Sequence, residues 1–191
     1  MIKNVLLVGV GGQGIILASK ILSSGLLEAG YDVKMSEVHG MAQRGGNVVT
    51  QVRYGENVYS PIVGKGQADV IVCFEKVEAL RWLDYLKDGG KIVINDYEIP
   101  SSTVLSGLET YPENIIEKIQ EVVKDVDVIK AADEAISLGN IKAQNVIMLG
   151  SLIKALELDG IDFTNAIKEN VKEKFISLNI KAFEIGKSLV K

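Results

Sequence analysis

The chain is poor in cysteine, histidine and proline: its 191 residues include one Cys, one His and three Pro. A single cysteine excludes an internal disulfide, and it excludes an iron–sulfur cluster held by this chain alone, which would need about four thiolates. Cys73 lies in the apolar run Val70–Phe74, so we interpret it as a small buried hydrophobic residue rather than a reactive thiol. We expect no metal site on this chain.

Long hydrophobic runs and basic blocks are also missing. The longest apolar runs, such as Val5–Val8 and Val70–Phe74, are too short to span a bilayer. The net charge is -4 and acids and bases are interspersed, which argues against a nucleic-acid partner. A strand pattern begins almost at the N-terminus and leaves no room for a signal peptide, so we expect a cytoplasmic protein without membrane contact.

Alternating strand and helix patterns predict an α/β fold: a Rossmann-like doubly wound sheet in one domain over residues 1–191. A first unit consists of a strand over Lys3–Val8, a helix over Ile15–Glu28 and a strand over Asp32–Met35. An inserted β-hairpin follows, with strands over Val48–Tyr54 and Asn57–Val63. The pattern then returns to strands and helices and ends in C-terminal helices over 143–158 and 164–189.

A glycine-rich turn follows the first strand and matches the dinucleotide fingerprint Gly-x-Gly-x-x-Gly. We take five residues as an anion-binding or interface turn: Gly9, Gly11, Gly12, Gln13 and Gly14. The fingerprint also needs an acid at the end of the second strand, and Glu37 is only near that place. NAD binding and a tight strand-to-helix crossing without a dinucleotide therefore both stay open.

The second motif is a polar run from Ser36 to Gly46, which reads Ser-Glu-Val-His-Gly-Met-Ala-Gln-Arg-Gly-Gly. Such a run suits a loop that presents polar groups to a ligand or a partner. His39 and Arg44 are the candidate catalytic residues, because an imidazole can transfer a proton near neutral pH and a guanidinium can hold a carboxylate or phosphate. Alternatively, His39 fixes an interface and Arg44 pairs with Glu37. The candidate substrate or interface residues are Glu37, Gly40, Gln43, Gly45, Gly46 and Asn145.

The role of Asn145 is open at this point. It precedes the apolar run Val146–Leu149, and it either faces the glycine turn or lies on a solvated helix edge.

Together, the glycine turn and the polar run resemble the small, gamma-type subunits of the 2-oxoacid:ferredoxin oxidoreductases. Within this family, the motif His-Gly-Met-Ala-Gln-Arg-Gly-Gly resembles the corresponding motif in the beta subunits of the indolepyruvate branch. The resemblance covers nearly the full length and includes Ala68–Val72, the segment Glu75–Leu86 and Asn179–Phe183.

The resemblance implies a subunit of a heteromeric complex that decarboxylates an arylpyruvate to an aryl-acetyl-CoA and passes electrons to ferredoxin. A large alpha subunit would hold thiamine diphosphate, magnesium and 4Fe-4S clusters, and coenzyme A would be the co-substrate. This chain has neither a cysteine cluster nor the Gly-Asp-Gly and Asn pattern of a thiamine site, so we expect it to be inactive alone and to bind none of these cofactors by itself.

Three alternatives stay open. The chain could be the gamma subunit of a pyruvate or other 2-oxoacid oxidoreductase, a stand-alone NAD(P)-dependent dehydrogenase, or a structural module with an empty glycine turn.

Overall fold

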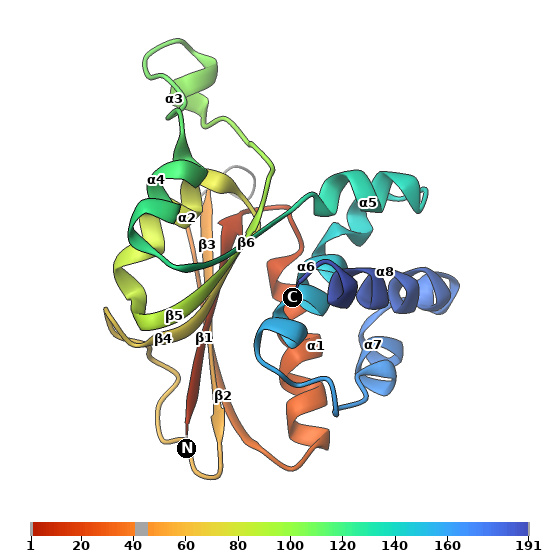
Figure 1. The fold of residues 1–191 in the computed structure, drawn as a ribbon. Helices are drawn as coiled ribbons and strands as arrows, with labels where there is room; N and C mark the ends of the chain where they lie inside the picture. Colours follow the sequence, from red (N-terminus) through yellow and green to blue (C-terminus); the bar gives the residue numbers. More distant parts are fainter. Residues whose placement is uncertain (1, 41–45, 191) are drawn as a thin grey trace.

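A computed structural model describes residues 2–40 and 46–190, and Figure 1 shows one twisted sheet with helices on both faces. The sheet has six strands in the order β2-β3-β1-β4-β5-β6. The strands are β1 (Lys3–Val10), β2 (Asp32–His39), β3 (Asn47–Gly55), β4 (Ala68–Cys73), β5 (Leu86–Asn95) and β6 (Asp125–Ile129). The α-helices are α1 (Ile15–Glu28), α2 (Lys76–Trp82), α3 (Ser102–Leu105), α4 (Ile115–Val122), α5 (Ala131–Ser137), α6 (Gln144–Ala155), α7 (Thr164–Asn170) and α8 (Ile176–Ser188).

The sheet is parallel on one side of β1 and antiparallel on the other. β4 pairs with β1 in parallel, and β5 and β6 continue the parallel side. The Val5–Val8 side chains of β1 are fully buried between the two helical layers, which explains why this strand is apolar on both faces. The α/β, Rossmann-like fold expected from the sequence is confirmed.

The hairpin differs from the expected one. β3 pairs antiparallel with both β1 and β2, so β2 and β3 form the hairpin. The second strand extends beyond the expected Met35 to His39, so Ser36–His39 of the polar run belong to β2 and only residues 40–46 connect the two strands. Residues 57–63, expected as its second strand, form no strand because both edges of β3 are already occupied. They are tied to β3 by side chains instead: Arg53 Nη1 donates to Ser60 O (2.9 Å) and Gln51 Oε1 accepts from Val63 N–H (2.6 Å).

Helices cover the two faces of the sheet separately. α1, α6, α7 and α8 lie on one face, and α2 and α4 lie on the other (Figure 1). The connection after β1 therefore leaves toward one face and the connection after β4 toward the opposite face. The gap between the carboxyl ends of β1 and β4 is the switch point, where open α/β sheets bind ligands.

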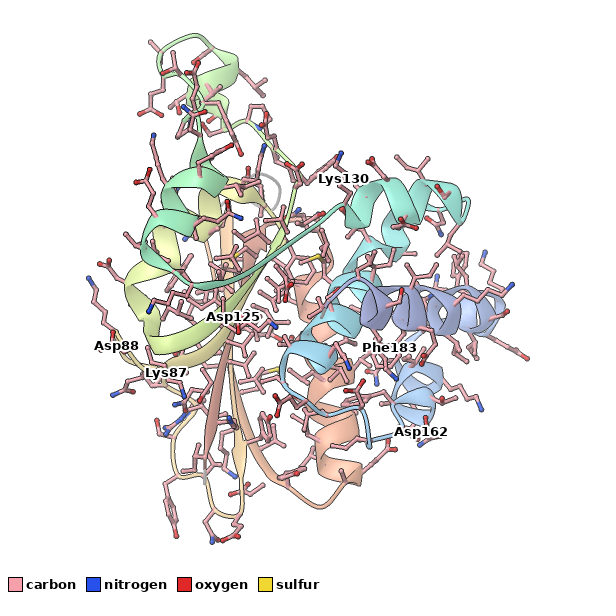
Figure 2. All side chains as sticks on the ribbon, viewed as in Figure 1. Lys87, Asp88, Asp125, Lys130, Asp162 and Phe183 are labelled. Carbon is pink, nitrogen blue, oxygen red and sulfur yellow. The ribbon has the colours of Figure 1, made fainter. Side chains whose placement is uncertain are left out.

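The C-terminal helices pack by close backbone approach. A Cβ atom added at Gly150 would lie 2.1 Å from Phe183 O, and one added at Gly186 would lie 2.0 Å from Ile147 O. Glycine at both positions lets α6 and α8 cross in contact. Phe183 of α8, labelled in Figure 2, packs with its ring centroid 5.7 Å from that of Phe163.

The single helix expected over 164–189 is divided into α7 and α8. Val171 and Lys172 have extended backbone at the break, and Asn170 Nδ2 donates back to Ala166 O (2.8 Å) at the end of α7. This local side-chain bond competes with continuation of the helix. Neither Gly nor Pro marks the break in the sequence.

Candidate functional site

The glycine turn connects β1 to α1, and two of its glycines are required by close contacts. A Cβ at Gly9 would lie 2.6 Å from Gln13 Oε1 and 2.8 Å from Phe74 Cβ. Gly14 has φ +78°, and a Cβ there would lie 2.5 Å from Asn145 Nδ2. The turn is therefore compact, and it packs against β4 on one side and against α6 on the other.

Gln13 closes the switch point between β1 and β4. Its Oε1 accepts from Val10 N–H (2.8 Å), and its Nε2 donates to Phe74 O (2.7 Å). The side chain is only 6% exposed. Both ends of the amide are thus used to join the carboxyl ends of two parallel strands, in the place where a dinucleotide phosphate would approach.

A buried amide network extends this closure to the neighbouring strands. Asn95 at the end of β5 is fully buried, donates to Phe74 O (3.2 Å) and accepts from Ala131 N–H (3.0 Å). Its Nδ2 also lies 3.4 Å from Gln144 Oε1. Asn95 is not among the site residues predicted from the sequence, although an Asn at the end of an apolar strand is a visible signal of a polar group at this edge.

Asn145 faces the glycine turn. Its Nδ2 donates to Gly14 O (3.2 Å), and the residue is buried. The alternative of a solvated helix edge is wrong for this residue, because the first turn of α6 packs directly on the start of α1.

The last residue of the polar run, Gly46, lies beside the glycine turn. Gly11 N–H donates to Gly46 O (2.8 Å), and Gly40 N–H donates to Asn47 O (3.0 Å). These two bonds fix both ends of the connection between β2 and β3. The two motifs that carry the family resemblance therefore meet at the carboxyl edge of the sheet.

The candidate residues of the polar run differ in how they are placed. His39 is exposed at the end of β2, with Nδ1 3.3 Å from Gly40 O. Glu37 is half-buried opposite Thr50 of β3, and its Oε1 has no hydrogen-bond partner among the described residues. Gln43, Arg44 and Gly45 lie outside the described residues.

A cavity of about 760 Å³ opens at the same edge, on the α2 side. The end of the polar run, the first turns of α2 and the segment around α3 line it, and α3 stands out beyond the sheet (Figure 1). Its charged lining residues are Glu75, Glu78, Arg81 and Glu109.

The carboxylate of Glu75 joins three segments that surround this cavity. It caps α2 by accepting from Glu78 N–H (3.1 Å), and it also accepts from Ile99 N–H (3.2 Å) and from the Tyr111 hydroxyl (2.5 Å). Burial and the bond to the Glu75 carboxylate raise the pKa of Tyr111 far above its ordinary value. Glu75 therefore holds the segment that carries α3 against α2.

Glu78 is less well satisfied than Glu75. Its side chain is buried, Oε1 lies 3.1 Å from Arg81 Nε, and Oε2 has no hydrogen-bond partner among the described residues. Burial raises the pKa of Glu78, and the negative charge of Glu75 adds to this, while Arg81 opposes it. A carboxyl group with a raised pKa beside a cavity is a candidate for binding or proton transfer.

The described residues do not form a metal or cluster site. In residues 2–40 and 46–190, no group of three or more His, Cys, Asp or Glu residues could hold a metal ion. Cys73 is fully buried, and burial raises the pKa of its thiol well above the ordinary value, so the thiolate that an iron–sulfur cluster requires is disfavoured. No helix in the described part is both long and apolar enough to cross a membrane.

Comparison with known proteins finds relatives over nearly the whole chain. Residues 4–189 match the family described as pyruvate ferredoxin/flavodoxin oxidoreductase. Among curated proteins, indolepyruvate oxidoreductase subunit IorB of Pyrococcus horikoshii is 41% identical, covering 96% of this chain and 93% of the relative. The protein of the same name from Thermococcus kodakarensis is 42% identical with the same coverage.

Solved structures share the fold at lower identity. The pyruvate oxidoreductase subunit PORC of Thermotoga maritima is 21% identical with a TM-score of 0.73, covering 100% of this chain and 97% of that one. The 2-oxoglutarate:ferredoxin oxidoreductase of Magnetococcus marinus has a TM-score of 0.74 and 21% identity, and the match covers 98% of this chain but 31% of that one. From the match over residues 4–189 and the 41–42% identity to its relatives, this chain belongs to the pyruvate ferredoxin/flavodoxin oxidoreductase family.

Proposed function

We propose that this chain is the small subunit of a cytoplasmic complex that oxidatively decarboxylates an arylpyruvate, such as indolepyruvate, to an aryl-acetyl-CoA with ferredoxin as electron acceptor. A larger partner subunit holds thiamine diphosphate, magnesium and 4Fe-4S clusters, and this chain acts as one domain over residues 1–191. The substrate assignment is supported by relatives at 37–42% identity that carry the name indolepyruvate oxidoreductase subunit IorB.

The observation that carries the proposal is the meeting of the two motifs at one edge. The bond from Gly11 N–H to Gly46 O (2.8 Å) holds the end of the polar run beside the glycine turn, and His39 is exposed at the end of β2. Exposed polar groups fixed on a rigid hairpin suit contact with a partner's active site. In this proposal His39 and Arg44 reach substrate or coenzyme A in the assembled complex, and Glu37, Gly40, Gln43, Gly45 and Gly46 support that contact.

The stand-alone dehydrogenase is disfavoured by Gln13. Its side chain fills the switch point with two short hydrogen bonds and would have to leave before a dinucleotide entered. The gamma subunit of a pyruvate or other 2-oxoacid oxidoreductase remains the alternative within the family. Relatives named 2-oxoglutarate synthase subunit KorC and pyruvate/ketoisovalerate oxidoreductases common subunit gamma are 25–29% identical.

The test is substrate preference of the reconstituted complex. The chain is co-expressed with the large subunit from the same genome and assayed with coenzyme A and ferredoxin on indolepyruvate, phenylpyruvate, pyruvate and 2-oxoglutarate. We expect kcat/KM to be highest for the two arylpyruvates. A clear preference for pyruvate or 2-oxoglutarate would assign the chain to another branch of the family.

A further inference from the structure

The cavity of about 760 Å³ beside α2, here called the α2–α3 cavity, has an acidic lining. It contains the carboxylates of Glu75, Glu78 and Glu109 and a single guanidinium, that of Arg81. No Lys and no further Asp or Glu is among its described lining residues. A positively charged group is therefore the complementary occupant.

Two of the three carboxylates are already used within the chain. Glu75 accepts from two backbone N–H groups and from the Tyr111 hydroxyl. Glu109 Oε2 accepts from the Thr103 hydroxyl (2.6 Å). These bonds hold the segment that carries α3 in place, and they leave Glu78 as the buried carboxylate with an unused oxygen.

Glu78 is only half satisfied by its surroundings. The residue is 4% exposed, Oε1 lies 3.1 Å from Arg81 Nε, and Oε2 is buried without a hydrogen-bond partner among the described residues. Burial raises the pKa of Glu78, and the nearby Trp82 indole opposes this, but its Nε1 is also buried without a partner in the described part of the chain. A buried carboxylate oxygen that lacks a donor is costly, which indicates that a ligand or partner supplies the donor.

The rim of the α2–α3 cavity is apolar and favours a protein as the occupant. Leu108 lines the cavity and is 79% exposed, and Leu105 on α3 is 76% exposed. The α3 segment stands out beyond the sheet, away from the helical layers (Figure 1). A small cation in the cavity would leave both leucines in water. Exposed leucines around a buried charge are typical of an interface in which apolar contacts exclude water from a polar one.

The place of the α2–α3 cavity indicates which protein fills it. Gly46 and Asn47, where the polar run ends and β3 begins, form part of its wall. The proposed function directs the polar run toward the large subunit, and the present inference rests on that proposal. A partner that contacts the polar run therefore reaches the cavity along the same edge of the sheet.

We propose that the α2–α3 cavity receives an arginine or lysine side chain of the large subunit, which pairs with Glu78 Oε2 while apolar residues beside it pack on Leu105 and Leu108. Arg81 keeps its contact with Oε1, so one carboxylate serves both this chain and its partner. The ionised carboxylate of Glu78 is then unfavourable in the isolated chain and satisfied in the complex. Assembly, rather than folding, depends on this charge.

The dissociation constant of the full chain from the large subunit of the same genome, measured by biolayer interferometry, tests this. Glu78→Gln should weaken binding roughly tenfold or more, because an amide cannot neutralise a buried cation. Leu105→Ala with Leu108→Ala should weaken it about fivefold. The matched controls are Glu121→Gln on α4 and Ile136→Ala on α5, both exposed and outside the described lining of the cavity. They should bind as the wild type does.

Melting of each isolated variant separates binding from folding. Glu78→Gln should not melt below the wild type, so its weaker assembly cannot come from an unfolded chain. If the wild type assembles and oxidises arylpyruvates while Glu78→Gln and the leucine variant bind no more weakly than their controls, this proposal is overturned and the proposed function stands. If the wild type does not bind the large subunit, both are overturned. Self-association of the isolated chain that Glu78→Gln abolishes would assign the cavity to a second copy and overturn the proposal as well.

Discussion

The buried polar residues at the carboxyl edge of the sheet fall into two kinds, and the difference decides what each can do. Gln13 and Asn95 use both ends of their amides within the protein and hold the ends of β1, β4 and β5 together. Glu78 keeps one carboxylate oxygen without a partner among the described residues. Residues of the first kind stabilise the fold, whereas Glu78 remains available for an incoming group.

We predict that Glu78→Gln stabilises the isolated chain at neutral pH. Burial raises the pKa of Glu78 in the folded state, so stability from its neutral form is present at low pH and is lost as pH rises from the ordinary value through the folded one. Glutamine stays neutral throughout. The melting temperature of the variant should therefore exceed that of the wild type at pH 7, and the gap should close near pH 4.

The control for this prediction is Glu121→Gln on α4, which is exposed. Its melting temperature should follow that of the wild type across the same pH range. A gap that is unchanged between pH 7 and pH 4 would show that the Glu78 charge does not limit stability.

His39→Ala and Arg44→Ala are predicted to lower kcat/KM in the reconstituted complex. Loss of a contact to a charged group is worth about 1.5–3 kcal/mol, which corresponds to roughly ten- to hundredfold. Steady-state kinetics with indolepyruvate provides the measurement, and size-exclusion chromatography verifies assembly. Unchanged kinetics in an intact complex would support a purely structural role for the polar run.

Among the elements, the α6–α8 crossing has the smallest tolerance for added volume. We predict that Gly186→Ala lowers the free energy of unfolding by about 1–3 kcal/mol, because the new Cβ would lie 2.0 Å from Ile147 O and the two helices would have to separate. Urea denaturation measures the change.

Gly160→Ala is the matched control, since a Cβ there meets nothing within 4 Å and no positive φ is involved. It should change the free energy of unfolding by no more than about 0.5 kcal/mol. If the two substitutions had equal effects, close packing at the crossing would not be the cause.

The sequence predicts most elements, and the exceptions have physical causes. Helix α1 spans Ile15–Glu28 as expected, because its apolar face and the following Gly30 are local signals. The partner of β3 is not a local property: residues 57–63 have strand-like composition, but β1 and β2 occupy both edges of β3. The division between α7 and α8 depends on the Asn170 side-chain bond. Neither Gly nor Pro stands at this position, so the sequence pattern does not indicate that the helix is broken.

The candidate site could be predicted only in part. The two motifs are visible in the sequence, but their meeting depends on the Gly11 to Gly46 bond, which follows from the inserted strand. In the sequence, Glu75 and Glu78 look like the acidic residues that are common at the start of a helix. Only their burial in the structure distinguishes them from exposed residues of that kind.

At the scale of the whole molecule, we predict that the isolated chain is colourless and does not oxidise 2-oxoacids with a viologen acceptor. Its single cysteine is buried and its thiol has a raised pKa, so the chain cannot ligate an iron–sulfur cluster by itself. Absorption near 400 nm and viologen reduction are the measurements, before and after addition of the large subunit. A brown and active isolated chain would contradict the proposal that the large subunit holds the iron–sulfur clusters and thiamine diphosphate.

The position of β3 also has a consequence for biosynthesis. β1 is synthesised before both of its neighbours, β3 and β4, which end at Gly55 and Cys73. Until those residues emerge, the fully apolar stretch Val5–Val8 has neither edge paired. Unpaired apolar strands associate readily with other chains. A chain truncated before Gly55 would therefore lack both complete neighbours of β1 and would be prone to aggregation.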